Sequence, residues 1–342
     1  MARKPRIEYA GAVYHVMNRG DRGGKVFKDR LDYELFVHTT AEVCERTGWR
    51  IHAWALLPNH FHWLLETPEA NLVAGMKWFL GAYSQRFNAR HGQRGHVFQG
   101  RYKAVVIDGQ SGGYFETVSR YVHLNPARAG LVAESGGGLE QYRWSSYGEY
   151  LRPKGQRARW LEVRRVLGNL NLRDGVAGRR RYRQYMEGEM AALRRPEGKK
   201  AFNKAWKPIR YGWYVGDERF RDSLLKRVAR AVEGKDRASY TGGAIRGHDE
   251  QQAEALVRRG MKVLNLVDEQ LADLSKGDER KCVLAWLAHT RTMASHKWIG
   301  RRLRMGCPSQ ISLHVARVNS DQDRRLLRLR RRVEKVIIEK KD

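Results

Sequence analysis

Two histidines separated by one bulky residue lie in an apolar run of the chain, Leu57-Pro58-Asn59-His60-Phe61-His62-Trp63-Leu64-Leu65. Side chains at i and i+2 of a β-strand point to the same face, so His60 and His62 would project together from a rigid platform. Imidazoles are common ligands of metal ions. The pair alone is not decisive, because two histidines in a strand are also found as ordinary core or surface side chains.

A tyrosine and an asparagine further along the chain have a spacing that fits the same chemistry. Tyr121 and Asn125 are four residues apart, so they share one face of a helix. Pro126 disfavours the helical conformation at Asn125, which predicts that the helix ends there. A phenol and an amide at a helix end could meet the two imidazoles and supply a nucleophile and a third metal ligand. Alternatively, Tyr121 belongs to a buried stripe with Tyr114 and Val118, and the residues alone favour this core interpretation.

The charge of the chain indicates its class of partner. The 342 residues contain 66 Lys and Arg against 37 Asp and Glu, a net charge of +29. Such an excess favours a polyanion, with nucleic acid as the leading candidate. No long apolar run and no secretory signal is present, so we expect a cytoplasmic, nucleoid-associated protein with no membrane partner. The scattered Cys44, Cys282 and Cys307 form neither a disulfide framework nor a zinc-binding spacing.

Hydrophobic patterning predicts a mixed fold in the first part of the chain. Strands are predicted at 12–18, 51–57, 60–66 and 102–107. Helices are predicted at 29–46, at 71–91 with Asn71 as the cap, and at 112–124. This order predicts an α+β, ferredoxin-like antiparallel sheet with helices, followed by a helical C-terminal region. The expected domains are 1–150, a basic connecting region with short helices at 151–245, and a helical domain at 246–342.

The predicted hairpin around Pro58-Asn59 gives a specific register. A two-residue loop pairs Leu57 with His60 and Ala55 with His62. The small side chain of Ala55 would leave space around the histidines. One face of the hairpin is then expected to carry Ile51, Ala53, Ala55, Leu57, His60, His62 and Leu64.

The C-terminal part contains a pattern that is typical of a helix-turn-helix. Helices are predicted at 281–290, 295–304 and 309–318, the last with Ser309 as its N-cap, and a turn around Gly306 separates the second from the third. Ser309 and Arg317 are the expected DNA contacts of the third helix. Any two short consecutive helices can give this pattern. The amphipathic helix predicted at 324–341 is equally compatible with docking onto the domain and with contacting DNA.

Three motifs, in this order, resemble those of a known family. They are Pro-Asn-His-Phe-His at 58–62, Gly-His-Val-Phe-Gln-Gly-Arg-Tyr-Lys at 95–103, and Arg-Tyr-Val-His-Leu-Asn-Pro-Ala-Arg-Ala-Gly-Leu-Val at 120–132. Together they look like the REP-associated tyrosine transposases, which are single-tyrosine HUH nucleases, and the resemblance covers roughly residues 5–150. The region around Ser309 is similar to the helix-turn-helix of replication-initiator proteins.

The resemblance implies roles for individual residues. His60 and His62 match metal ligands, Tyr121 matches the nucleophile, and Asn125 matches the position of a further ligand, where related transposases often have Gln. The implied cofactor is Mg²⁺ or Mn²⁺. The implied reaction is cleavage and rejoining of single-stranded DNA through a 5′-phosphotyrosine, on hairpin-forming palindromic repeats, by a monomer or homodimer. With the resemblance, nucleophile is preferred to core residue for Tyr121.

Basic residues in and next to these motifs are the expected DNA contacts, namely Arg101, Lys103, Arg120 and Arg128. Simple surface solvation explains Arg101 and Lys103 equally well. Two other functions fit the sequence. One is a non-catalytic DNA-binding regulator that acts through the C-terminal helices, and the other is a metal-dependent phosphohydrolase that uses water and no covalent intermediate.

Overall fold

The structure is a computed structural model, and it describes residues 7–132, 138–207, 209, 212–232, 243–292, 294–320 and 323–338. Contacts between residues divide the chain into two compact units, with the division between Leu224 and Leu225. The N-terminal unit runs from Arg6 to Leu224, and the C-terminal unit follows it. The three-domain division at about 150 and 245 stays a prediction.

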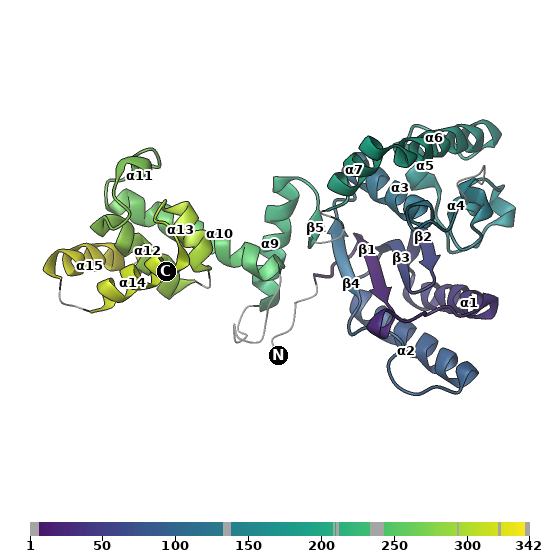
Figure 1. Cartoon of the computed structure of the whole chain (residues 1–342), viewed down its shortest axis with the longest axis horizontal. Helices are drawn as coiled ribbons and strands as arrows, with labels where there is room; N and C mark the ends of the chain where they lie inside the picture. Colours follow the sequence, from purple (N-terminus) through teal and green to yellow (C-terminus); the bar gives the residue numbers. More distant parts are fainter. Residues whose placement is uncertain are drawn as a thin grey trace. The chain divides into compact units, whose positions relative to one another are not determined.

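A five-stranded sheet forms the centre of the N-terminal unit, in the order β2-β3-β1-β4-β5 (Figure 1). The strands are β1 (Ala12–Arg19), β2 (Arg50–Leu57), β3 (His60–Thr67), β4 (Lys103–Ile107) and β5 (Tyr214–Val215). The first four pair antiparallel, and β5 adds in parallel to β4. The predicted α+β class and the four predicted strands are confirmed.

Helices cover both faces of this sheet (Figure 1). On one face lie α1 (Arg30–Thr47) and α2 (Leu72–His91), where Phe36 and Phe79 pack on Trp63 of β3 at ring-centroid distances of 5.6 and 4.6 Å. On the other face lies α3 (Gly112–Arg128), which contacts β2 and β3. The chain then adds α4 (Tyr147–Tyr150), α5 (Arg164–Asn169), α6 (Val176–Arg194) and α7 (Pro196–Ala205). The division between the two units falls within α9 (Glu218–Val232). Because strand side chains alternate, each face receives its own set.

The hairpin of β2 and β3 has the predicted register near its turn. Leu57 pairs with His60, and Ala55 pairs with His62. The prediction for Ile51 is wrong, because a register shift between Ile51 and Ala53 puts Ile51 opposite Leu65. A bulge of this kind inserts one residue and reverses the alternation beyond it. His52 consequently contacts Phe115 of α3, with ring centroids 4.9 Å apart.

Two predicted helix ends differ in detail from the structure. Asn71 takes the N-cap position of α2 as predicted, but its side chain makes no capping hydrogen bond, because its Oδ1 instead accepts one from the indole of Trp49 at 2.7 Å. Helix α3 does not end at Asn125 but continues through Pro126 to Arg128. A proline removes one backbone donor, but the following turn still closes, with the Ala129 N–H donating to the Asn125 carbonyl at 2.9 Å. Arg128 therefore follows Tyr121 by seven residues on the same helical face.

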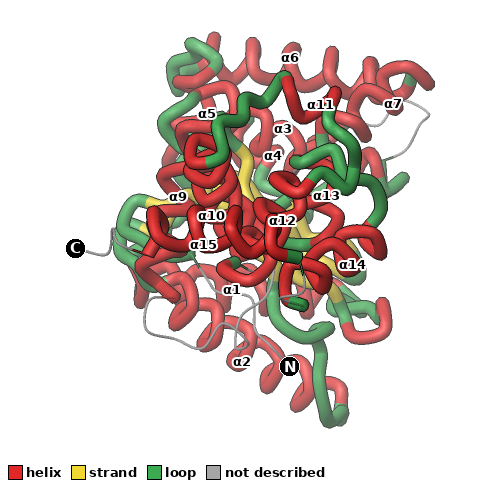
Figure 2. The backbone as a smooth tube through the Cα atoms, turned by 90° about the vertical axis from the view of Figure 1, so that its left-hand side faces the viewer, coloured by secondary structure: helices red, strands yellow, loops and turns green. Residues whose placement is uncertain are grey.

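The described part of the C-terminal unit consists of helices and loops (Figure 2). The helices are α10 (Gly243–Val263), α11 (Gln270–Asp273), α12 (Glu279–Arg291), α13 (His296–Arg302), α14 (Pro308–Asn319) and α15 (Arg324–Ile338). Ser309 is not the N-cap of α14; that position is Cys307, whose N–H donates to the side-chain oxygen of Gln310 at 3.3 Å. Residues 339–341 of the predicted last helix lie outside the described residues. None of the described helices combines the length and the apolar character needed to span a bilayer.

Candidate functional site

A pocket of ≈ 530 Å³ lies on the face of the sheet that α3 covers. Strands β1, β3 and β4, the turn before β3, the segment before β4 and helix α3 all contribute to it. The lining residues are Met17, Asn18, Arg19, Asn59, His60, His62, Arg101, Lys103, Tyr121 and Arg128. The structure thus brings together six of the residues singled out from the sequence, namely His60, His62, Tyr121, Arg101, Lys103 and Arg128.

The two imidazoles of the pocket lie side by side, as the strand period requires. Their ring centroids are 5.0 Å apart. His60 is half-buried and His62 is buried. Burial lowers the pKa of His60 to about 4, with further contributions from Arg128 and Arg19. His60 is therefore neutral at physiological pH and can offer a ring nitrogen to a metal ion.

Tyr121 is the third element of the pocket. Its ring centroid lies 5.7 Å from that of His62 and 5.6 Å from that of His15. Other contacts of the phenol ring are with α7 and the residue after it, with Trp206 at 4.8 Å and Phe202 at 6.0 Å. Only 1% of Tyr121 is exposed. The side chain is thus buried and lies against the imidazoles, so Tyr121 is both a core residue and a candidate nucleophile.

The position of α3 is fixed by a histidine two residues after Tyr121. His123 is fully buried, and its two ring nitrogens lie 2.7 Å from the Tyr182 hydroxyl and 2.8 Å from the Ser146 hydroxyl. Burial lowers the pKa of His123 to about 3. The neutral ring links α3 to α6 and to the segment before α4, so His123 has a structural role.

Asn125 does not line the pocket in the part of the chain that the structure describes. It is fully buried, and its Oδ1 accepts hydrogen bonds from Nε and Nη2 of Arg128 at 3.3 and 3.0 Å. Its amide nitrogen donates to the Tyr121 carbonyl at 3.2 Å. Arg128 in turn lies 6.0 Å from the centre of the Tyr121 ring. For Asn125 to become a metal ligand, Arg128 would have to release this oxygen.

The other predicted DNA contacts lie elsewhere. Arg120 is on α3 but outside the pocket, with an ion pair to Glu189 of α6 at 3.0 Å and a hydrogen bond to Tyr185 at 3.2 Å. Ser309 and Arg317 are exposed on α14 of the C-terminal unit. Arg317 pairs with Asp323 at 2.8 Å. Their DNA contacts stay predictions.

Three further residues complete the site. Sequence reasoning assigned no role to Arg19 and Trp206, and it left His15 of the first strand as either a surface or a site-adjacent imidazole. Arg19 and His15 lie on β1, which pairs with β3, and their alternate spacing with Met17 was the signal that could have found them. Trp206 follows α7, in a region whose pattern gives no indication of contact with Tyr121. Burial and then Lys103 lower the pKa of His15 to about 3, so its imidazole is also neutral.

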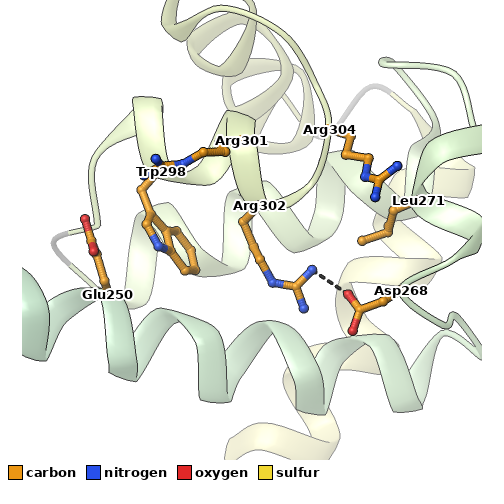
Figure 3. A pocket seen from close by; sticks show the side chains of 7 residues that line it. All are labelled: Glu250, Asp268, Leu271, Trp298, Arg301, Arg302 and Arg304. Carbon is orange, nitrogen blue, oxygen red and sulfur yellow. Dashed lines mark hydrogen bonds and ion pairs between the residues drawn. The ribbon is translucent and has the colours of Figure 1, made fainter. Parts of the chain in front are cut away.

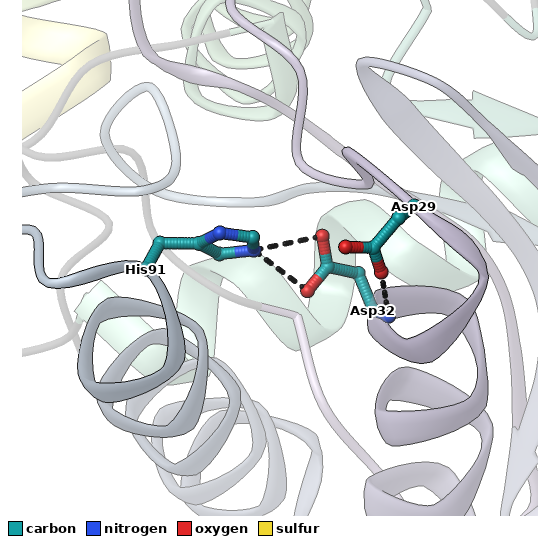
Figure 4. Close-up of side chains that lie close together, drawn as sticks. All are labelled: Asp29, Asp32 and His91. Atoms are coloured by element: carbon teal, nitrogen blue, oxygen red, sulfur yellow. Dashed lines mark hydrogen bonds and ion pairs between the residues drawn. The ribbon is translucent and has the colours of Figure 1, made fainter.

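A second group of side chains could in principle surround an ion, as Figure 4 shows. One ligand atom each of Asp29, Asp32 and His91 lies within 4.8 Å of the others. However, Arg90 already pairs with both carboxylates, at 2.7 Å from Asp29 and 2.6 Å from Asp32. His91 also bonds to Asp32, at 2.9 Å. In this arrangement the cluster ties the start of α1 to the end of α2, and an ion would have to displace the guanidinium.

The C-terminal unit has a cavity of its own, of ≈ 400 Å³, drawn in Figure 3. Arg302 extends into it and pairs with Asp268 at 2.6 Å and with Glu254 at 2.6 Å. These ion pairs connect α13 to α10 and to the segment before α11. The cavity is therefore built around internal ion pairs of the unit.

Comparisons with known proteins agree with the motifs. Residues 8–125 match the family model described as "Transposase IS200 like". No curated protein matches the chain. One similar solved structure, described as "Structure of the REP associates tyrosine transposase bound to a REP hairpin", has 18% identity and a TM-score of 0.37 over 46% of this chain and 89% of that one. The family match confirms the resemblance recognised from the motifs, and residues 8–125 are similar to the IS200-like transposases.

Proposed function

We propose that the N-terminal unit cleaves and rejoins single-stranded DNA through a covalent bond to Tyr121. The observation that carries the proposal is the meeting of Tyr121 with His62, 5.7 Å apart by ring centroids, in a pocket lined by basic side chains. A phenol can act as the nucleophile on a phosphodiester, paired imidazoles can hold a metal ion, and cationic side chains can stabilise the phosphate. The family match of residues 8–125 supports the same reaction class.

In this reaction the Tyr121 oxygen attacks a backbone phosphorus of the DNA. An O–P bond forms to tyrosine and the bond from phosphorus to the 3′ oxygen breaks. The phenolic proton is released, and the departing 3′ oxygen takes up a proton. Because the phosphotyrosine keeps the energy of the phosphodiester, a 3′-hydroxyl can reverse the step without a nucleotide cofactor.

We propose that the pocket holds Mg²⁺ or Mn²⁺ through His60 and His62. Imidazole nitrogens suit transition metals such as Mn²⁺, and phosphate oxygens suit both ions. When bound, the ion would polarise the phosphate and stabilise the departing oxygen. Asn125 is the proposed further ligand, on the condition that a bound phosphate draws Arg128 away from its side-chain oxygen. Arg101 and Lys103, which line the same pocket, are proposed to hold the phosphates of the strand.

The proposed substrate is a single strand that folds into a hairpin, as palindromic repeats do. The test incubates the full chain with such DNA, taken from the repeats nearest its gene, in the presence of Mg²⁺. We expect a covalent adduct that peptide mapping places on Tyr121, and complete loss of the adduct in Tyr121→Phe. The matched control is Tyr114→Phe on the same helix, which should keep the adduct. An adduct that survives Tyr121→Phe, or cleavage with no adduct at all, would overturn the proposal, and the latter would indicate a water-using phosphohydrolase.

A second function, binding of duplex DNA by the C-terminal unit, is favoured by one observation. Helix α14 buries Ile311, Val315 and Val318 and leaves Ser309, Leu313 and Arg317 exposed. Leu313 is 70% exposed, which is unusual for a large apolar side chain on a helix. A helix that follows a short turn and presents such a face fits the major groove. If the unit binds duplex DNA while Tyr121 forms no adduct, the protein is a regulator and not an enzyme.

A further inference from the structure

Both histidines of the pocket have a side-chain partner on the same ring nitrogen, Nδ1. Nδ1 of His60 lies 2.6 Å from Oδ1 of Asn59. Nδ1 of His62 lies 3.0 Å from Nε2 of His15. The two partners come from different elements, since Asn59 belongs to the turn before β3 and His15 lies on β1. Neither contact follows from the other, and yet both occupy Nδ1 of the ring rather than Nε2.

The partner of His60 decides where its proton lies. Asn59 donates through its amide nitrogen to the Gly23 carbonyl at 3.3 Å, so its Oδ1 faces the histidine. A carbonyl oxygen only accepts hydrogen bonds. The proton of the neutral His60 ring is therefore on Nδ1, and Nε2 keeps its lone pair.

The contact of His62 with His15 follows from the sheet register. Met17 pairs with His62, and His15 pairs with the next residue but one, Leu64, so the two rings lie on the same face of adjacent strands. Their nitrogens are 3.0 Å apart, their centroids are 5.1 Å apart and their planes differ by 11°. The rings therefore meet edge to edge, as in an N–H···N hydrogen bond. One proton lies between them, on either His62 Nδ1 or His15 Nε2.

The buried imidazole of His15 is energetically unfavourable in a protein core. It is fully buried, and its Nδ1 has no hydrogen-bond partner. Burial of an unsatisfied polar atom is unfavourable, and native structures avoid it unless the group has another role. An apolar ring of similar size would fill the space next to His62 and Tyr121 without this cost. The orphaned nitrogen thus indicates that the contact of His15 with His62 is what retains the imidazole.

We propose that Asn59 and His15 are positioning residues that accept the Nδ1 protons of His60 and His62 and so direct both Nε2 lone pairs toward one bound cation. The inference rests on the proposed metal site and assigns it two residues outside its ligands. Partners of this kind fix the tautomer and the orientation of a ligating ring. They also give a function to Asn59, the residue that precedes the two histidines in the motif.

The first test measures Mn²⁺ binding to the full chain by isothermal titration calorimetry. We expect Asn59→Ala and His15→Phe each to weaken binding by roughly 10- to 100-fold, the usual effect of losing such a partner. Asn59→Asp keeps an acceptor for the His60 proton and should bind within a few-fold of the unmodified protein. The control is His52→Gln, which replaces a buried histidine of β2 that does not line the pocket and should leave Mn²⁺ affinity unchanged. Unchanged affinity in both Asn59→Ala and His15→Phe would overturn the inference.

The second test is independent of the metal and of activity. In protein with ¹⁵N-labelled histidine, the ring-nitrogen shifts report which nitrogen carries the proton. We expect His60 and His62 both to carry it on Nδ1, and a proton on Nε2 of either ring would overturn the inference. If the unmodified chain binds no Mn²⁺, the proposed metal site fails, and the ¹⁵N result alone then decides the hydrogen-bond pairing. Asn59 lies in a half-buried turn, so Asn59→Ala keeps the calorimetric test informative should His15→Phe fail to fold.

Discussion

Four basic side chains meet the paired imidazoles from different parts of the fold. Arg19 comes from β1, Arg101 from the segment before β4, Lys103 from β4 and Arg128 from α3. Three of these elements are held by strand pairing or by α3 packing, so the cations are preorganised around the pocket. A phosphodiester that enters it would be held before any bond changes, which is how positioned charges contribute to phosphoryl transfer.

Lys103 gives the sharpest test of this arrangement. We expect Lys103→Gln to weaken single-stranded DNA binding similarly for all sequences and to reduce the slope of log affinity against log salt by about 1. The reason is that the variant neutralises one phosphate fewer and releases one counterion fewer on binding. The measurement is fluorescence anisotropy over a salt series. Lys77→Gln, an exposed lysine of α2 on the opposite face of the sheet, should leave the slope unchanged, and equal slopes for both variants would refute the role of Lys103.

The residues of the site differ in how far the sequence could predict them. His60 and His62 were predictable because the side-chain period of a strand puts them on one face whatever the rest of the fold does. The surroundings of Asn125 were not, because they depend on α3 continuing through Pro126. Local propensity disfavours that continuation, and the packing of the helix on the sheet overrides it. Arg128 is then carried onto the face of Tyr121, where it bonds to Asn125.

At the scale of elements, α7 and the residue that follows it cover the proposed nucleophile. Trp206 is 1% exposed and contacts both Tyr121 and Phe202. This covering wall lies outside residues 8–125, the part that matches the family. The core of the N-terminal unit therefore extends well beyond that match.

Truncation of Trp206 should show how much the packing of α7 and Trp206 on Tyr121 contributes to the stability of the fold. We expect Trp206→Ala to lower the free energy of unfolding by about 3–5 kcal/mol, as for other fully buried aromatic residues, and Trp206→Phe to lower it less. Denaturant unfolding of the full chain provides the measurement. Trp160→Ala removes a half-buried tryptophan of the same unit and should cost less. A loss for Trp206→Ala no larger than that of Trp160→Ala would show that the wall is not part of the core.

A carboxylate on β3 links three elements and makes their association depend on pH. Glu66 accepts from Nε2 of His52 on β2 at 3.1 Å and pairs with Arg50 at 3.3 Å and with Arg165 of α5. The hydrogen bond from His52, together with the neighbouring arginines, holds the pKa of Glu66 below its usual value of 4.5. A depressed acid pKa stabilises the fold above that value, and the contribution is lost as the pH falls below it.

Replacement of Glu66 should therefore flatten the acid side of the stability profile. We expect Glu66→Gln to destabilise the protein at pH 7 and to lose less further stability than the unmodified chain between pH 5 and pH 3. Urea unfolding at a series of pH values measures both effects. The exposed Glu140→Gln serves as the control with an unchanged profile. An identical pH dependence in Glu66→Gln would mean that Glu66 is not the group responsible.

The elements themselves were largely predictable, but their local irregularities were not. The order from β1 to α3 follows from hydrophobic period and turn residues. The bulge next to His52 does not, because a register shift depends on the partner strand and on the segment around Glu162, whose carbonyl lies 3.2 Å from the His52 ring. Strand β5 is too short, at two residues, to leave a periodic signal, and it forms because β4 offers an edge to pair with.

At the scale of the whole molecule, the two units carry different kinds of exposed chemistry. The N-terminal unit holds the pocket that is proposed to take a single DNA strand. The C-terminal unit presents a helix face with Ser309, Leu313 and Arg317 exposed, which is proposed to contact the groove of a duplex. Hairpin DNA offers both kinds of surface, a paired stem and unpaired strands. The large positive charge of the chain would favour either contact, so only substitutions in each unit can separate their contributions.

The double substitution Ser309→Ala and Arg317→Ala makes that separation. We expect it to weaken binding of duplex DNA. The loss should be about 1–3 kcal/mol for each side chain that reaches a base edge. For each phosphate that is no longer neutralised, the slope of log affinity against log salt should fall by about 1. The yield of the Tyr121 adduct on a short unpaired strand should not change, because its pocket lies wholly in the other unit. Duplex affinity is measured by anisotropy, and adduct yield by gel shift.

Lys262→Ala, which replaces an exposed lysine of α10, controls for the removal of a positive charge. If duplex affinity is the same in the double variant and the control, α14 is not the DNA-contacting helix; if adduct yield falls as well, the two units do not act separately.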